Sequence, residues 1–221
     1  MNDTRLRGVV DTDLFDYGPE RSRLLVRLWR KLAGGEPLTA PDIRAASDAA
    51  GIGPADADAF LHSVSERDGD GRIVGLLGLS LNDHPHRFIV GGRTFTTWCA
   101  IDTLFLPAML GTEATVESRS PFSGRDVRVT VGPGGVHEVD PPGSVVSVPI
   151  VDPDEVDTSS TEGIWSAFCH RIYFFPDDEE AGQWVEGRGR MEIVPVSAAH
   201  TYAMETWSKV LPHVQALDAE R

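Results

Sequence analysis

Two cysteines and one aspartate are the residues whose types and spacing could do chemistry. Cys99 and Asp102 lie in the segment Trp98-Cys99-Ala100-Ile101-Asp102, where a predicted strand gives way to a predicted helix. A spacing of three residues places both side chains on one face of the first helical turn. The free N–H groups and the positive dipole end of that turn favour a thiolate at Cys99. Because a thiolate and a carboxylate so close together repel each other, we expect one shared proton and a raised pKa for either group.

Cys169 is the other cysteine of the chain, and it begins an aromatic segment in which residues 170–175 are predicted as a strand. Two thiolates that converge on one point suit a soft, thiophilic metal much better than magnesium or calcium. They are too few for a closed structural zinc site, which needs four ligands. Spacing alone leaves the alternative open that both cysteines are buried packing residues, with Asp102 as a helix cap. His170 could assist Cys169 as a base or merely pack.

Other polar groups are interpreted as structural. His84 and His86 lie near a turn without a partner at helical spacing, so we expect them at the surface. Asp68 and Asp70 resemble part of a calcium loop, but the glycine at the sixth place and the glutamate at the twelfth are absent. The sequence therefore predicts a turn there.

The elements that must position these residues begin with three short helices. An apolar stripe predicts the first helix around residues 24–32. The second runs to Ala50, with Thr39 as its N-cap, Asp42 completing a capping box and Gly51 ending it. The third covers residues 55–64, and a hairpin of strands 72–74 and 76–81 follows.

Three helices and a hairpin are typical of a winged-helix module, a plan that often binds DNA. Here the third helix presents Asp56 and Asp58 where a groove-reading helix would present Arg, Lys or Asn. We therefore predict a packing module. With its preceding arm, it divides the chain into an arm at residues 1–20, a module at 21–81 and a core at 82–221.

The core alternates strands and helices and is predicted as a mixed α+β domain with open β-sheets. The helix that follows Cys99 is apolar and ends at Gly111. The predicted strands cover residues 87–90, 94–97, 114–118, 127–131, 145–150, 170–175 and 192–196. The other predicted helices cover residues 162–167, 177–185 and 197–211.

Composition and charge exclude several classes of protein. The 221 residues are 41% hydrophobic and 24% charged, which is ordinary for a globular protein. A net charge of −14 repels phosphate backbones, so nucleic acid is a poor partner. No apolar run approaches the roughly 20 residues of a membrane-spanning helix, and the first residues lack a secretory apolar stretch. We expect a cytoplasmic protein without a membrane partner.

The segment Gly92-Arg93-Thr94-Phe95-Thr96-Thr97-Trp98-Cys99-Ala100-Ile101-Asp102-Thr103-Leu104-Phe105-Leu106-Pro107-Ala108 closely resembles the organomercurial (alkylmercury) lyases. The similarity continues through Phe168-Cys169-His170 and the pair Phe174-Phe175, and it covers roughly residues 87–210. The helices before it match that family's winged-helix-like module in outline. Two positions depart from the family pattern, because Ser120 and His170 stand where relatives often carry cysteine.

The resemblance implies that Cys99, Cys169 and Asp102 form the catalytic trio. A thiolate, with Cys99 expected first, would displace X from the mercury of R–Hg–X, and the second cysteine would then add. Asp102 would protonate the leaving carbon as general acid. The products would be R–H and Hg(II) held by Cys99 and Cys169, with Asp102 a possible further ligand. Trp98, Phe168 and Phe174 would be candidates for the pocket around R.

The same resemblance implies no cofactor, because mercury(II) itself prefers thiolate sulfur. External cellular thiols would be co-reactants, and a mercuric reductase could accept the ion. Two alternatives stay open at this point. One is a non-catalytic soft-metal carrier that uses the same thiolates, and the other is a winged-helix DNA-binding regulator.

Overall fold

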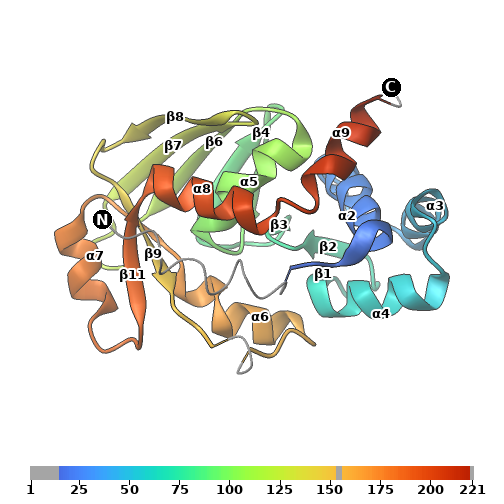
Figure 1. Ribbon diagram of the computed structural model, residues 1–221, viewed down its shortest axis with the longest axis horizontal. Helices are drawn as coiled ribbons and strands as arrows, with labels where there is room; N and C mark the ends of the chain where they lie inside the picture. Colours follow the sequence, from blue (N-terminus) through green and yellow to red (C-terminus); the bar gives the residue numbers. More distant parts are fainter. Residues whose placement is uncertain (1–14, 153–155, 220–221) are drawn as a thin grey trace.

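The computed structural model describes residues 15–152 and 156–219 of the chain (Figure 1). The predicted arm at residues 1–20 therefore lies largely outside the described residues. The helices are α2 (Gly18–Leu32), α3 (Ala40–Ala50), α4 (Pro54–Val64), α5 (Ala100–Leu110), α6 (Thr161–Ala167), η2 (Cys169–Arg171, a 3-10 turn), α7 (Asp178–Val185), α8 (Val196–Thr206) and α9 (Leu211–Ala219). The strands are β1 (Ser65–Arg67), β2 (Ile73–Leu76), β3 (Leu79–Ser80), β4 (His86–Val90), β5 (Arg93–Thr97), β6 (Ala114–Arg119), β7 (Asp126–Gly132), β8 (Gly135–Asp140), β9 (Val145–Pro149), β10 (Phe174–Phe175) and β11 (Met191–Pro195).

The strands form two open antiparallel sheets. The larger has eight strands in the order β1-β2-β3-β5-β4-β6-β7-β8, and the smaller has the order β10-β9-β11. The predicted α+β class with open sheets is confirmed. None of the described helices is long and apolar enough to cross a membrane.

All three predicted N-terminal helices form, but α2 begins at Gly18, before the predicted start near residue 24 and inside the predicted arm. The second helix has the predicted ends. Thr39 and Asp42 make the reciprocal capping box of α3, and Gly51 ends that helix with a φ of +75°. Strands β1 to β3 of this region continue into the large sheet through the pairing of β3 with β5. Whether the module is of winged-helix type and whether a domain boundary lies at residue 82 stay predictions.

Helix α5 is central to the fold, and it starts at the residue after Cys99. Every residue from Ala100 to Met109 is buried, as expected of a helix that is apolar all round. One side of α5 packs on β4, β5 and β7 of the large sheet, and the other contacts α2, α8 and α9 (Figure 1). This packing fixes the N-terminal end of α5, where the first candidate site residue lies.

The structure differs from the predicted elements at three places in this framework. The β2–β3 turn is the pair Leu77-Gly78, not Gly75, because Gly75 pairs with Ser80 inside the ladder. Strand β8 was not predicted. It pairs with β7 through a bulge opposite Thr130 and Val131, and this bulge interrupts the alternation of apolar and polar residues that identifies a strand. The predicted helix 197–211 is two helices, since α8 ends at Thr206 and α9 starts at Leu211, directly before a proline.

Candidate active site

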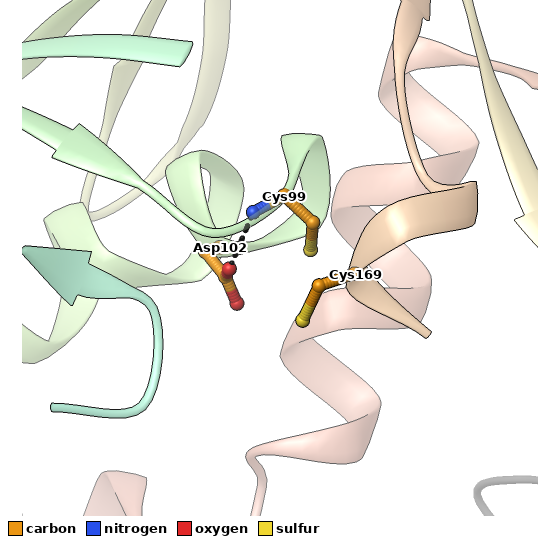
Figure 2. A group of neighbouring side chains, drawn as sticks. All are labelled: Cys99, Asp102 and Cys169. Carbon is orange, nitrogen blue, oxygen red and sulfur yellow. Dashed lines mark hydrogen bonds between the residues drawn. The ribbon is translucent and has the colours of Figure 1, made fainter. Parts of the chain in front are cut away.

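Cys99 is the N-cap of α5, so its position follows directly from where the helix starts. Its backbone is extended, with φ −148° and ψ 172°, and the helix begins at Ala100. The backbone N–H of Cys99 donates to Oδ2 of Asp102 at 2.8 Å (Figure 2). Asp102 thus caps the helix and is held beside the thiol by the same bond.

Cys169 comes from a different part of the chain, on η2 between α6 and β10. The predicted strand over residues 170–175 is wrong in its first half, because the chain makes a 3-10 turn there and only Phe174–Phe175 pair with β9. The turn is fastened to α5: the backbone N–H of Ala100 donates to the carbonyl oxygen of Ile172 at 3.2 Å. A free N–H of the helix start therefore anchors the segment that carries the second cysteine.

The structure brings the three predicted site residues together. One ligand atom from each of Cys99, Asp102 and Cys169 lies within 4.8 Å of the others, and all three side chains are buried. Both cysteines are free thiols. Figure 2 shows the two sulfur atoms and the carboxylate of Asp102 turned toward one space. Two sulfurs and one oxygen at these separations can hold one soft metal ion.

Burial sets the protonation of Asp102. It raises the pKa of the carboxyl group to about 6, although the hydrogen bonds from the Cys99 thiol and backbone N–H, and the charge of His84, oppose the shift. A carboxyl group with this pKa exchanges protons readily near neutral pH, as a proton shuttle must. The expected rise is confirmed.

The pKa values of both thiols are raised as well. Burial raises that of Cys99 well above its usual range, and the neighbouring Cys169 and Asp102 add to the rise. For Cys169 the neighbouring Cys99 lowers the pKa of the thiol, but burial and Asp102 outweigh it. Burial thus opposes the thiolate that the helix start was expected to favour at Cys99.

An apolar cavity surrounds the trio. Trp98 and Phe168 line it, as predicted for the organic group, whereas Phe174 lies away from it against the ring of His86. Phe15, Tyr202 and Trp207 complete an aromatic wall that the sequence did not reveal. Phe15 comes from the start of the described chain, Tyr202 from α8 and Trp207 from the residue that ends α8, so only tertiary packing shows that they meet.

The predicted surface position of His84 and His86 is wrong. His86 is fully buried on β4, where its Nδ1 lies 2.7 Å from Oγ of Ser118, and burial lowers its pKa to about 3. His84 is mostly buried and its Nε2 lies 3.1 Å from Oε2 of Glu66. The sequence does not indicate a role for Glu66, because its partners are distant in the chain.

Ser120 and His170, the two residues that depart from the family pattern, lie in different environments. Ser120 is buried and donates a hydrogen bond to Oε1 of Glu180, so it serves the packing of α7 against the β6–β7 turn. His170 is exposed, with its ring 6.0 Å from that of Trp165, and it does not line the cavity of the trio. The Asp68 turn is confirmed, since Oδ1 of Asp68 accepts the N–H groups of Asp70 and Arg72.

Comparisons with known proteins agree on one family. The sequence model of the alkylmercury lyases matches residues 79–208. Alkylmercury lyase of Staphylococcus epidermidis is 37% identical, over 84% of this chain and 82% of its own length. The enzyme of Pseudomonas putida is 35% identical, over 83% and 82%, and that of Streptomyces lividans 38%, over 78% of each.

A solved structure supports the same assignment. The crystal structure of the mercury-bound form of MerB2 superimposes with a TM-score of 0.72 at 25% identity, and the match covers 94% of this chain and all of that one. The family match includes Cys99, Asp102 and Cys169, the three residues that the fold gathers in one buried cavity. The chain belongs to the alkylmercury lyase family.

Proposed function

We propose that this chain cleaves the carbon–mercury bond of organomercurials R–Hg–X by protonolysis and releases R–H and Hg(II). The observation that carries the proposal is the close approach of two thiols and one carboxyl group, all within 4.8 Å, inside an apolar cavity. The thiols supply ligands that mercury prefers, the carboxyl group supplies a proton donor, and the cavity walls suit a hydrocarbon group.

The first step is displacement of X by one cysteine. We take Cys169 as the first nucleophile, because Asp102, which accepts the backbone N–H of Cys99, then lies beside the thiol that reacts second. Its sulfur forms a bond to mercury, the Hg–X bond breaks, and X leaves with the proton of that cysteine. Because the site is buried and apolar, the R group stays in the cavity beside Trp98 and Phe168.

The second step needs a base close to the other thiol, and Asp102 fills that role. Cys99 gives its proton to Asp102 and its sulfur becomes the second ligand of mercury. Electron donation from two sulfurs weakens the Hg–C bond, and the proton on Asp102 then moves to the leaving carbon. The bond between carbon and mercury breaks with both electrons on carbon, so R–H forms and Hg(II) stays on Cys99 and Cys169.

Turnover then requires other thiols to remove the ion. We propose external cellular thiols as co-reactants, a mercuric reductase as the acceptor of the ion, and no further cofactor. A reducing compartment such as the cytoplasm supports this arrangement, since both cysteines must stay free.

The test is hydrocarbon release from methylmercury or phenylmercury in the presence of excess thiol. The proposal predicts many equivalents of methane or benzene per chain. Stoichiometric mercury binding without any hydrocarbon would show a thiolate metal carrier on this fold and contradict the proposal.

A further inference from the structure

A buried carboxylate outside the trio, Glu66 on β1, lies at the back of the active site. Its side chain is 8% exposed. Nε1 of Trp98 donates a hydrogen bond to its Oε1, and Nδ2 of Asn82 donates to its Oε2 at 2.7 Å. Nε2 of His84 lies 3.1 Å from the same Oε2. One carboxylate thus joins β1 to two other segments, the loop before β4 and the residue that follows β5.

Glu66 is ionised in this place. Burial raises its pKa, but the hydrogen bonds from His84, Asn82, Trp98 and Ser80 together outweigh burial and bring it to about 2. The fold also leaves room for it, because a Cβ on Gly75 would lie 2.0 Å from Oε1 of Glu66. A buried charge with four polar partners and a glycine shaped around it is held in one position.

The partner that links Glu66 to the reaction is Trp98. Its indole lines the cavity of the trio and stands edge-on to Trp165, with ring centroids 5.5 Å apart. Its backbone N–H donates to the carbonyl oxygen of Gly78 at 3.1 Å, and Cys99 is the next residue. The indole is therefore fixed at its nitrogen by Glu66 and at its backbone by the β2–β3 turn.

We propose that Glu66 is a positioning residue for the reaction: it locks the indole of Trp98 as a fixed wall for the organic group of the substrate, and so holds Cys99 in line with the mercury. This inference rests on the proposed function. Glu66 itself touches neither substrate nor the reacting atoms. A buried indole N–H normally has a hydrogen-bond partner, and Glu66 is the acceptor that this one has.

The test compares Glu66→Ala, Glu66→Gln and the matched control Asn82→Ala, which removes a neighbouring hydrogen bond to the same carboxylate but leaves that of Trp98. Methane release from methylmercury with excess thiol gives kcat and KM, and thermal melting and Hg(II) titration report the fold and the thiols. We expect Glu66→Ala to bind one Hg(II) per chain but to lower kcat at least tenfold. Glu66→Gln should stay within threefold of wild type, because its amide oxygen accepts the same bond, and Asn82→Ala within twofold.

If Glu66→Ala does not fold, Glu66→Asp replaces it, since this variant keeps the charge but withdraws the carboxylate from Trp98. It should also lose at least tenfold in kcat. A double-mutant cycle adds a check. The double variant Glu66→Ala/Trp98→Phe should be no slower than Trp98→Phe alone, because each substitution removes the same hydrogen bond. Wild-type kcat in folded Glu66→Ala or Glu66→Asp, with only a lower melting temperature, would overturn the proposal.

A second readout separates this proposal from the proposed function. In protein labelled with 5-fluorotryptophan, the ¹⁹F resonance that disappears in Trp98→Phe belongs to Trp98. It should shift and broaden in Glu66→Ala and stay in place in Glu66→Gln. An unchanged Trp98 resonance in Glu66→Ala would overturn the positioning role, whatever the activity of the wild type. Absence of methane release by the wild type would contradict only the proposed function.

Discussion

Gly78 lies so close to Asp102 that any side chain at this position would occupy the space of the carboxyl group. A Cβ built on Gly78 would be 2.5 Å from Cγ of Asp102, and the φ of Gly78 is +97°. Gly78 is part of the β2–β3 turn, whose Leu77 lines the cavity and has a positive φ of 35°. The N-terminal region therefore forms one wall of the active site.

Gly78→Ala should displace Asp102 and abolish most of the protonolysis. Gly91→Ala is the matched control, because Gly91 also has a positive φ, +56°, but no atom near its Cβ position. We expect each variant to lose about 1–2 kcal/mol of unfolding free energy from the strained backbone. Only Gly78→Ala should lose hydrocarbon release, measured per folded chain. Equal activity in the two variants would show that Asp102 does not need this contact.

Asp102→Asn should separate mercury binding from carbon protonation. The amide oxygen can still accept the N–H of Cys99, so α5 and both thiols should keep their positions. The amide cannot deliver a proton, and general acid catalysis contributes on the order of a hundredfold or more. We expect Hg(II) titration to match wild type, and hydrocarbon release in rapid-quench experiments to be slower by at least that factor. A variant that turns over normally would exclude Asp102 as the proton donor.

The pH dependence of kcat/KM should reflect Asp102. The carboxyl group must be ionised to accept the proton of Cys99, and its pKa is raised to about 6 by burial. Activity should therefore be present above this pH and fall as the pH drops through it, with a slope of one decade per pH unit. The residual activity of Asp102→Asn should lack this acid limb. The same limb in the variant would assign the titration to another group.

Ser120→Cys tests whether the position that departs from the family pattern matters for catalysis. The hydroxyl of Ser120 donates to buried Glu180, and a thiol is a weaker donor. We expect a loss of about 1 kcal/mol in unfolding free energy, measured in urea, with unchanged kcat. Because Ser120 lies outside the cavity of the trio, a changed rate would mean that this region communicates with the active site.

Local signals in the sequence predict helices α3 and α5, and α5 with its N-cap carries Cys99 and Asp102. The capping residues of α3 and the apolar run of α5 between Cys99 and Gly111 fix where these helices start and end. The three-residue spacing from Cys99 to Asp102 then determines their contact. These features depend on residues a few positions apart, so no tertiary information is needed.

The missed features depend on contacts between distant segments. Glu66 and His84 lie 18 residues apart in the chain, and nothing near either residue indicates that they meet. The 3-10 turn of Cys169 replaces part of a predicted strand because the carbonyl of Ile172 accepts the first N–H of α5. The pairing of the two cysteines came from family resemblance, since their spacing of 70 residues has no local meaning.

The central claim is that the trio itself breaks the carbon–mercury bond, and a single-turnover experiment without external thiol tests it most directly. Methylmercury is added to one equivalent of protein in D₂O, and methane, bound mercury and reactive thiols are counted. The account predicts one equivalent of CH₃D, one Hg(II) retained and both cysteines lost to thiol reagents. Folded Cys99→Ala and Cys169→Ala should release none. Mercury retained with its methyl group intact on the wild-type protein would contradict the account.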